Sequence, residues 1–137
     1  MTDIPPKDRF LRYSKRIHII EKDGKTTIAS SNFLLRKERE EEYLSGAWYE
    51  FLEPSTREDC LQKATTFMMQ NMGFKKINGA FSIHNVADIL AKSDESVKYI
   101  VRHIGGGHAK SGIWPQPSTL HNAEEIADTV TDVLIVK

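Results

Sequence analysis

The spacing of apolar and polar positions changes along the chain, and each change marks a predicted element. Residues 16–29, RIHIIEKDGKTTIA, alternate on both sides of Asp23-Gly24. An Asp-Gly pair between two alternating runs is the strongest short-range signal for a β-hairpin. We therefore expect a hairpin with strands over 16–21 and 25–29.

Helical spacing predicts a long helix over 55–72. Apolar residues recur there every three or four positions, as they do on one face of a helix: Leu61, Ala64, Met68 and Met72. Ser55 and Glu58 match a capping box at its start, and Gly73 stands where helices commonly end on glycine. Methionines on such a face are typical of flexible core filler rather than of a cofactor site.

Short strands and helices are mixed in the second half of the chain. Alternation predicts a strand over 79–84, and Asn85 is suited to cap a following helix over 86–92. A further strand is expected over 96–103, and a last helix over 123–134 with acidic residues in its first turn. The order of these elements does not follow a regular β-α-β repeat.

This irregular order favours the α+β class, with a small, mostly antiparallel sheet packed by helices. The β-branched residues 131–137 fit a strand as well as they fit the end of a helix, so their state stays open. Residues 1–6, which include two prolines, are expected to form a flexible N-terminal arm. Residues 7–137 are expected to form a single domain, because 137 residues suffice for one ordinary core.

Charge and cysteine content narrow the function classes. The 19 basic and 19 acidic side chains cancel, which argues against a protein that binds nucleic acid over its whole surface. Cys60 is the single cysteine, so no internal disulfide or cysteine zinc cage is expected, and a reducing cytoplasm is the simplest location. No window is apolar enough for a membrane span or a signal peptide, so no membrane partner is expected.

Four stretches in order resemble a group of small, uncharacterised bacterial proteins: RFLRYSKRI, FLLRKEREEEYLSGAWYEFL, GAFSIHNVADI and HAKSGIWP. The resemblance runs from about Arg9 to Val133, with Gly46 and the run IGGGH as departures from the pattern. It implies a bacterial origin, a single cytoplasmic domain and no established activity. The matching positions are Arg12, Phe33, Leu44, Ser45, Trp48, Glu50, Phe81, Asn85, Val86, His108 and Ala109.

His108 is the first candidate for chemistry, because it follows three glycines in the loop IGGGHAKSG. Gly106 and Gly107 could let the backbone approach an anion, and an imidazole exchanges protons near neutral pH. The alternative is a tight turn after a strand, in which the imidazole fills a gap. His103 alternates with the apolar residues of the preceding strand, which predicts a core position.

The block LSGAWYEFL supplies the other catalytic candidates, Ser45 and Glu50. Ser45 is either a nucleophile or phosphate ligand, or the N-cap of a short helix that runs to Leu52. Glu50 is either an exposed position or a carboxylate whose pKa is raised by aromatic neighbours. Trp48, Tyr49 and Trp114 are candidate anchors of a protein interface, although Trp48 also suits a core.

Basic and aromatic residues alternate over 7–16, KDRFLRYSKR. Arg12 and Arg16 are candidate ligands for phosphate, with the neighbouring rings available to stack on bases. A solvated edge strand guarded by cations has the same composition. The five histidines do not show the spacing of a metal site, so no metal and no cofactor are expected.

Three functions follow from these patterns. The first is a protein-interaction or accessory module, which could belong to a bacterial defence or toxin-type system, with an unspecified protein partner. The second is a small enzyme or anion-binding domain that acts on a nucleotide or RNA, if Arg12, Ser45, Glu50 and His108 meet in one pocket. The third is a single-stranded nucleic-acid binder that uses residues 7–16. The oligomeric state is not indicated.

Overall fold

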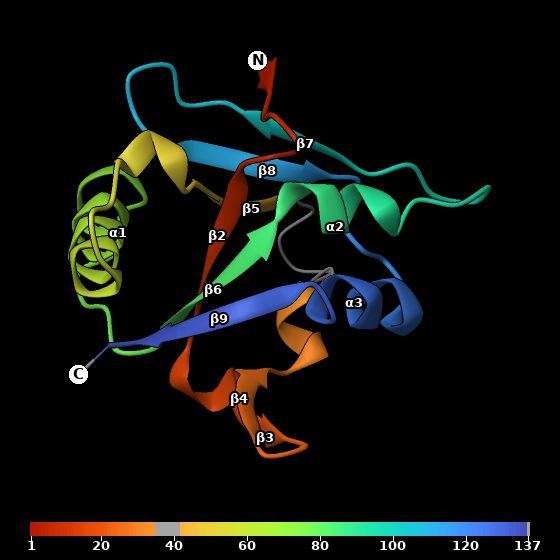
Figure 1. Cartoon of the computed structure of the whole chain (residues 1–137), viewed down its shortest axis with the longest axis horizontal. Coiled ribbons are helices and arrows are strands. Elements are labelled where there is room, and N and C mark those ends of the chain that lie inside the picture. Colours follow the sequence, from red (N-terminus) through yellow and green to blue (C-terminus); the bar gives the residue numbers. More distant parts are fainter. Residues whose placement is uncertain (35–41, 137) are drawn as a thin grey trace.

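The computed structural model describes residues 1–34 and 42–136, and within them the chain folds as the expected α+β domain (Figure 1). The charge run RKEREEE, for which a solvated helix or exposed loop is expected, lies outside the described residues, apart from Glu42. In the described part, an antiparallel sheet has the strand order β1-β7-β8-β5-β2-β6-β9, and β3 and β4 form a separate hairpin. The strands are β1 (Thr2–Asp3), β2 (Arg9–Ser14), β3 (Ile19–Lys22), β4 (Lys25–Ile28), β5 (Leu44–Trp48), β6 (Ala80–Asn85), β7 (Ile100–His103), β8 (Lys110–Trp114) and β9 (Val130–Ile135).

Both faces of the sheet are covered. Helix α1 (Arg57–Asn71) packs on one face, where Phe67 and Met68 meet Leu11 and Phe81 of the sheet. Helices α2 (Val86–Ala91) and α3 (Leu120–Ala127) pack on the other face together with the β3–β4 hairpin (Figure 1). Central strands such as β6 are therefore buried on both sides, which places the polar residues Ser82 and His84 of β6 in the core beside its apolar residues.

The predicted hairpin is confirmed. Its turn is Asp23-Gly24, with positive φ angles of 53° and 78°, as a type I′ turn requires. The first strand starts later than expected, because residues 16–18 form a 3-10 turn before β3. The hairpin also stands apart from the main sheet rather than extending it.

Helix α1 confirms the helix predicted over 55–72, but the predicted capping box of Ser55 and Glu58 is wrong. The N-cap is Thr56, whose Oγ1 accepts the Asp59 N–H at 3.0 Å. Ser55 instead donates its N–H and hydroxyl to the Asp59 carboxylate. At the other end Gly73 has a φ of +76°, the left-handed conformation expected of a terminal glycine.

The predicted helix over 123–134 is wrong in its second half. Helix α3 is capped by Thr119 and ends at Ala127, and the following β-branched residues form strand β9. Pairing with β6 gives these residues a hydrogen-bonding partner and a half-buried face, which suits side chains branched at Cβ. The alternative prediction, a strand over 131–137, is thus confirmed as far as Ile135.

The remaining elements differ from their predictions mainly at their ends. The strand over 79–84 is β6, and the helix over 86–92 is α2. The strand over 96–103 is regular only from Ile100, although Val97 and His103 are both buried as the alternation predicts.

The first residues are not a loose arm. Thr2 and Asp3 pair with β7, and Ile4, with 3% of its surface exposed, joins the core. The prediction of a flexible arm over 1–6 is therefore wrong for these positions. No helix in the described residues is long and apolar enough to cross a membrane.

Candidate functional site

The main sheet divides between β2 and β5. Strand β2 pairs with β6 along its whole length, but it pairs with β5 only at Phe10 and Leu11. Continued pairing would place Tyr13 opposite Ser45, yet the paired positions end before them. Strand β5 stays paired with β8 at Ser45, so the two halves of the sheet separate here.

Arg12 spans this division. Its Nη1 donates to the Ser45 carbonyl at 2.7 Å, and its Nη2 donates to the Asn32 carbonyl at 3.0 Å. The opening contains a cavity of about 340 Å³, which lies between the two strands and the C-terminal end of α1. Met68 of α1 and Met72, the residue that follows the helix, form part of its apolar wall.

Buried amides line the same cavity. Asn32 donates its Nδ2–H to Ser14 Oγ at 2.8 Å. Gln116 donates its Nε2–H to the Phe33 carbonyl at 3.2 Å, which fixes the other amide atom as Oε1, since a carbonyl accepts only a donor. Gln116 is 8% exposed, and its Oε1 is buried without a hydrogen-bond partner among the described residues. Sequence reasoning missed Gln116, because a glutamine between two prolines carries no motif.

The four residues proposed for an enzyme do not meet in one pocket. Arg12 and Ser45 line the cavity at the sheet division. Glu50 does not line this cavity, and His108 lines a different one, together with Phe51 and Phe67. A site that needs all four side chains is therefore not formed among the described residues.

Glu50 is held by Arg9. Its Oε1 accepts the Arg9 backbone N–H at 2.7 Å, and its Oε2 accepts Arg9 Nε–H at 2.9 Å. The Arg9 guanidinium also lies 3.9 Å above the Tyr49 ring. Cys60 lies close by, and burial raises the pKa of its thiol to about 11, so it is not a thiolate nucleophile at neutral pH. This cluster fastens the start of β2 to the segment after β5, and the pairing leaves Glu50 no role in the cavity.

His108 closes the β7–β8 turn. Its Nδ1 accepts a hydrogen bond from the Lys110 N–H at 3.3 Å, while its carbonyl oxygen accepts a hydrogen bond from His103 Nε2–H at 2.7 Å. A Cβ on Gly105 would overlap the His108 ring, and Gly106 adopts a φ of +61°, so these two glycines are required by the turn itself. The alternative of a tight turn with a gap-filling imidazole is therefore supported. Gly107, the other predicted ligand-binding glycine, is exposed.

Several predicted aromatic anchors are engaged within the chain. Trp48 donates its Nε1–H to Asp8 at 2.9 Å and packs edge-on against His103. Trp114 lies against Tyr43 with ring centres 4.5 Å apart. Tyr49 supports the Arg9 guanidinium. The predicted short helix from Ser45 is wrong, because Ser45 belongs to β5 and only residues 50–52 form a 3-10 turn.

The basic segment 7–16 is not a guarded sheet edge. Strand β2 lies between β5 and β6, inside the sheet. Arg12 points to carbonyl groups and Arg9 to a carboxylate, while Arg16 donates to the Asn78 carbonyl at 3.4 Å. Two of these arginines therefore anchor the fold rather than forming a continuous cationic strip.

A buried histidine was also missed as a candidate. His84, on β6, is fully buried between Ser82 and Thr129, at 2.8 Å and 2.7 Å from its two ring nitrogens. Burial, with a smaller contribution from the Arg12 charge, lowers its pKa to about 3. The group resembles a serine–histidine pair, but it lines none of the described cavities and serves the core. The described residues hold no cluster of three or more His, Cys, Asp or Glu that could bind a metal.

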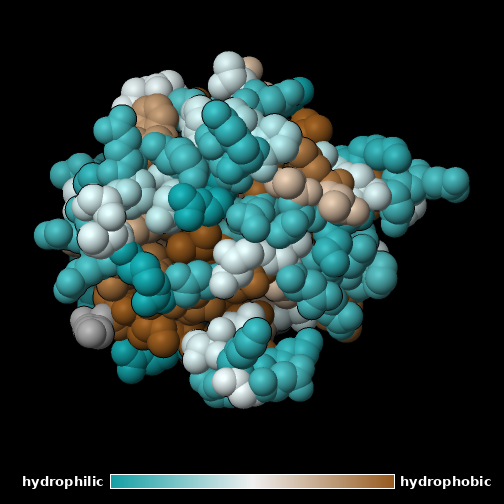
Figure 2. Space-filling model, viewed as in Figure 1, coloured by the Kyte–Doolittle hydropathy of each residue, from teal (hydrophilic) through white to brown (hydrophobic). Residues whose placement is uncertain are grey.

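Strand β9 provides the longer free edge of the sheet, since β1 at the other edge has only two residues. Beside it a groove of about 870 Å³ runs along α1, from Arg57 to Thr66, and along residues 133–136. Figure 2 shows apolar side chains gathered along the C-terminal half of β9 next to α1. Ile135 is 44% exposed there.

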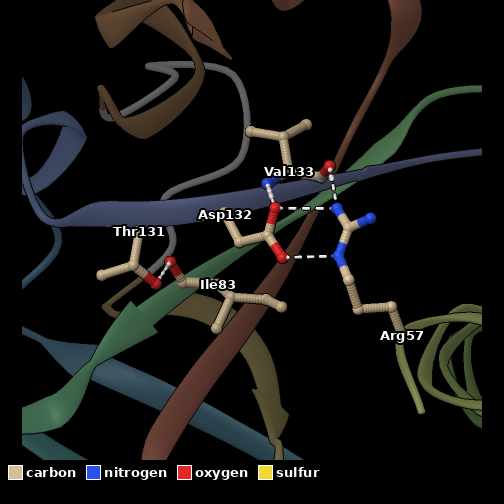
Figure 3. Close-up of polar contacts among 5 residues, drawn as sticks. All are labelled: Arg57, Ile83, Thr131, Asp132 and Val133. Atoms are coloured by element: carbon tan, nitrogen blue, oxygen red, sulfur yellow. Dashed lines mark hydrogen bonds and ion pairs between the residues drawn. The ribbon is translucent and has the colours of Figure 1, made fainter.

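Side chains close part of this edge (Figure 3). Arg57 reaches from α1 to form a two-bond ion pair with Asp132, at 2.8 Å and 2.9 Å. The same two side chains bond the Val133 backbone, Asp132 to its N–H at 2.9 Å and Arg57 to its carbonyl at 3.4 Å. Figure 3 also shows Thr131 donating to the Ile83 carbonyl of β6.

Comparisons of the chain with protein-family models, with curated proteins and with solved structures found no match.

Proposed function

We propose that this protein is an interaction module that binds an extended, uncharged segment of a partner protein along the edge of β9. The observation that carries the proposal is an apolar edge strand beside a large groove. Strand addition to such an edge supplies affinity through main-chain hydrogen bonds and specificity through pockets for alternate side chains.

The register of β9 identifies the backbone groups that a partner strand would use. The Val136 N–H bonds the Gly79 carbonyl, and Leu134 lies opposite Phe81. Because hydrogen-bonded and non-bonded pairs alternate in an antiparallel ladder, the backbone groups of Val133 and Ile135 point away from β6. The backbone N–H and C=O of Val133 are covered by the exposed ion pair of Arg57 and Asp132, and exposed ion pairs contribute little stability. The backbone groups of Ile135 are available to a partner.

The groove favours a segment with alternating apolar side chains. One set of its side chains would enter the groove beside Leu61 and Thr65, and the other set would cover Ile135. Residues 133–136 carry no charge, and Arg57 and Asp132 already neutralise each other. Glu58 adds a carboxylate to the groove lining, so an acidic segment fits it least, and the uncharged residues 133–136 favour an uncharged segment along the strand itself.

Replacing the outward-facing N–H of Ile135 tests this function. Proline is tolerated at a strand edge where the N–H is not used in the ladder, so Ile135→Pro should fold while losing a donor to the partner. Peptides selected from a displayed random library on the immobilised protein should bind Ile135→Pro at least about tenfold more weakly than the wild type, as expected for a lost hydrogen bond with added steric conflict. Calorimetric titration of the selected peptides measures the difference.

Ile135→Val is the matched control, because it keeps the N–H and the β-branched side chain. It should bind the selected peptides nearly as well as the wild type. Equal binding by all three proteins would refute recognition at this edge. Sedimentation should show a monomer; a dimer that Ile135→Pro dissociates would assign the edge to a second copy instead of a partner.

We also propose the cytoplasm as the location of this interaction. The proposal is supported by the single cysteine, which is buried in the core as a free thiol and has no disulfide to gain from an oxidising compartment.

A further inference from the structure

We propose that the cavity at the division between β2 and β5 is a binding site for a small organic anion that carries an apolar body and one N–H or O–H donor. The site is separate from the groove along β9 and does not depend on the proposed protein interaction. The chemistry of its lining defines the ligand.

The first argument is that the cavity lies where backbone pairing between β2 and β5 stops. Main-chain pairing of β2 with β5 ends at Leu11–Ala47, although both strands continue. Backbone groups of Tyr13 and Ser45 that would have bonded to each other therefore border an opening. Arg12 spans the gap instead, through the Ser45 carbonyl.

The second argument is the unsatisfied oxygen of Gln116. Burying a carbonyl oxygen without a donor costs about 1–3 kcal/mol, so buried acceptors in folded proteins are nearly always bonded. Gln116 lines the cavity, and its amide nitrogen is already committed to the Phe33 carbonyl. A ligand with an N–H or O–H group would supply the missing donor once the Gln116 side chain shifts to admit it, because the oxygen itself has almost no accessible surface.

The third argument is the distribution of charge and apolar surface. The described lining contains the cations Arg12 and Lys15 and no carboxylate. Met68, Met72 and Phe74 offer apolar and aromatic surface on the opposite side. The volume of about 340 Å³ lies at the small end of ligand pockets, which typically begin near about 300 Å³. A compact carboxylate or phosphate ester with a ring fits these properties.

Two probes distinguish the two sources of such an anion. Uridine 5′-monophosphate offers a phosphate and a ring N–H, and N-acetylphenylalanine offers a carboxylate and an amide N–H. We expect one of them to bind in calorimetric titrations and to raise the melting temperature, since a ligand of the native state stabilises it. Inorganic phosphate alone should bind at least about tenfold more weakly, because it lacks the apolar body.

Two methionines, Met69 on α1 and Met72 directly after it, give a matched pair of variants. Met72 lines the cavity, whereas Met69 is 47% exposed and does not. Met72→Trp should fill the cavity and abolish binding of the probe, while Met69→Trp should bind as the wild type does. Lys15 is exposed, so Lys15→Gln should fold in any case and weaken binding up to about fivefold, with a smaller salt dependence.

Failure of both probes at concentrations up to about 10 mM would overturn the proposal. So would binding that Met72→Trp and Lys15→Gln both leave unchanged. Loss of peptide binding in Ile135→Pro with retained probe binding would leave this site intact, so the two proposals fail separately.

Discussion

Polar side chains in the core of this protein are held by partners of fixed donor or acceptor character. The Thr129 hydroxyl donates to the Ile126 carbonyl, so it can only accept from His84 Nδ1. His84 Nε2 then accepts the Ser82 hydroxyl at 2.8 Å. These partners hold the buried imidazole neutral. A second proton, on Nε2, would break the hydrogen bond from Ser82 and would create a charge that water cannot hydrate.

This arrangement predicts a stability that falls in mild acid. The pKa of His84 is about 3 in the folded protein, below the ordinary value of 6.5, so the unfolded chain binds more protons between these values. Above about pH 6.5 the free energy of unfolding does not depend on protonation of His84. As the pH falls from 6.5 toward 3, the free energy of unfolding decreases. We expect urea unfolding to show roughly 2 kcal/mol less stability at pH 5 than at pH 7 from this residue.

The variant His84→Gln should lack that part of the pH dependence, because glutamine does not titrate. An unchanged slope between pH 7 and pH 5 in the variant would show that other groups cause it. If His84→Gln does not fold, a wild-type free energy of unfolding that is flat over this range would contradict the prediction.

Gly105 and Gly107 give a second test at single residues. A Cβ at Gly105 would overlap the His108 ring and carbonyl, whereas a Cβ at Gly107 would meet open space. Gly105→Ala should therefore lower the free energy of unfolding by about 1–3 kcal/mol, as overpacking does, and Gly107→Ala should change it by less than about 0.5 kcal/mol. Chemical denaturation of both variants measures the difference, and equal effects would contradict the assigned turn.

At the level of elements, ends are determined by individual hydrogen bonds. Helix α1 begins at Arg57 because Thr56 Oγ1 accepts the Asp59 N–H, while Ser55 serves Asp59 from outside the helix. The helix ends before Gly73, whose positive φ terminates it. A one-residue error in the cap therefore moves the whole first turn.

Substitution of the cap tests the corrected start of α1. Thr56→Ala removes the oxygen that accepts the Asp59 N–H and should cost about 1 kcal/mol of folding free energy. Ser55→Ala, which loses an exposed hydroxyl contact, should cost about half as much or less. Guanidinium unfolding distinguishes them, and a larger loss for Ser55→Ala would restore the capping box as the start of the helix.

Local signals predicted the elements that depend on local chemistry. The Asp23-Gly24 turn and helix α1 are set by neighbours in sequence, and both were predicted. Strand β9 was predicted mainly as helix, because its pairing with β6 joins residues about fifty positions apart and leaves only the β-branched residues as a local sign. The same reason hides the candidate cavity: Arg12 was identified, but Gln116 and the gap between β2 and β5 depend on long-range register.

On the scale of the whole molecule, neighbouring strands of the main sheet come from distant parts of the chain. Its two edges are the first and last described strands, β1 and β9. The N-terminal segment is consequently part of the core, with Ile4 packed against the face that carries α2 and α3. Pairing of Thr2 and Asp3 with β7 extends the sheet at that side.

Ile4→Ala tests the contribution of this terminal segment. Loss of a fully buried isoleucine side chain should lower stability by about 2–5 kcal/mol. Met1→Ala, at a residue that is 74% exposed, is the control and should be nearly silent. A small effect of Ile4→Ala in thermal and urea unfolding would support a detached arm after all.

The narrow junction between β2 and β5 has a consequence for how the chain acquires its shape. On one side of it lie β1, β7, β8 and β5, and on the other β2, β6 and β9. Each side is assembled from segments drawn from the beginning, middle and end of the chain, so neither can form ahead of the other as a local unit. Assembly must wait for distant segments to meet, which slows folding relative to a helical protein of the same size. In the folded protein, the amides of β2 and β5 that face this junction should exchange with deuterium before the other amides inside the sheet.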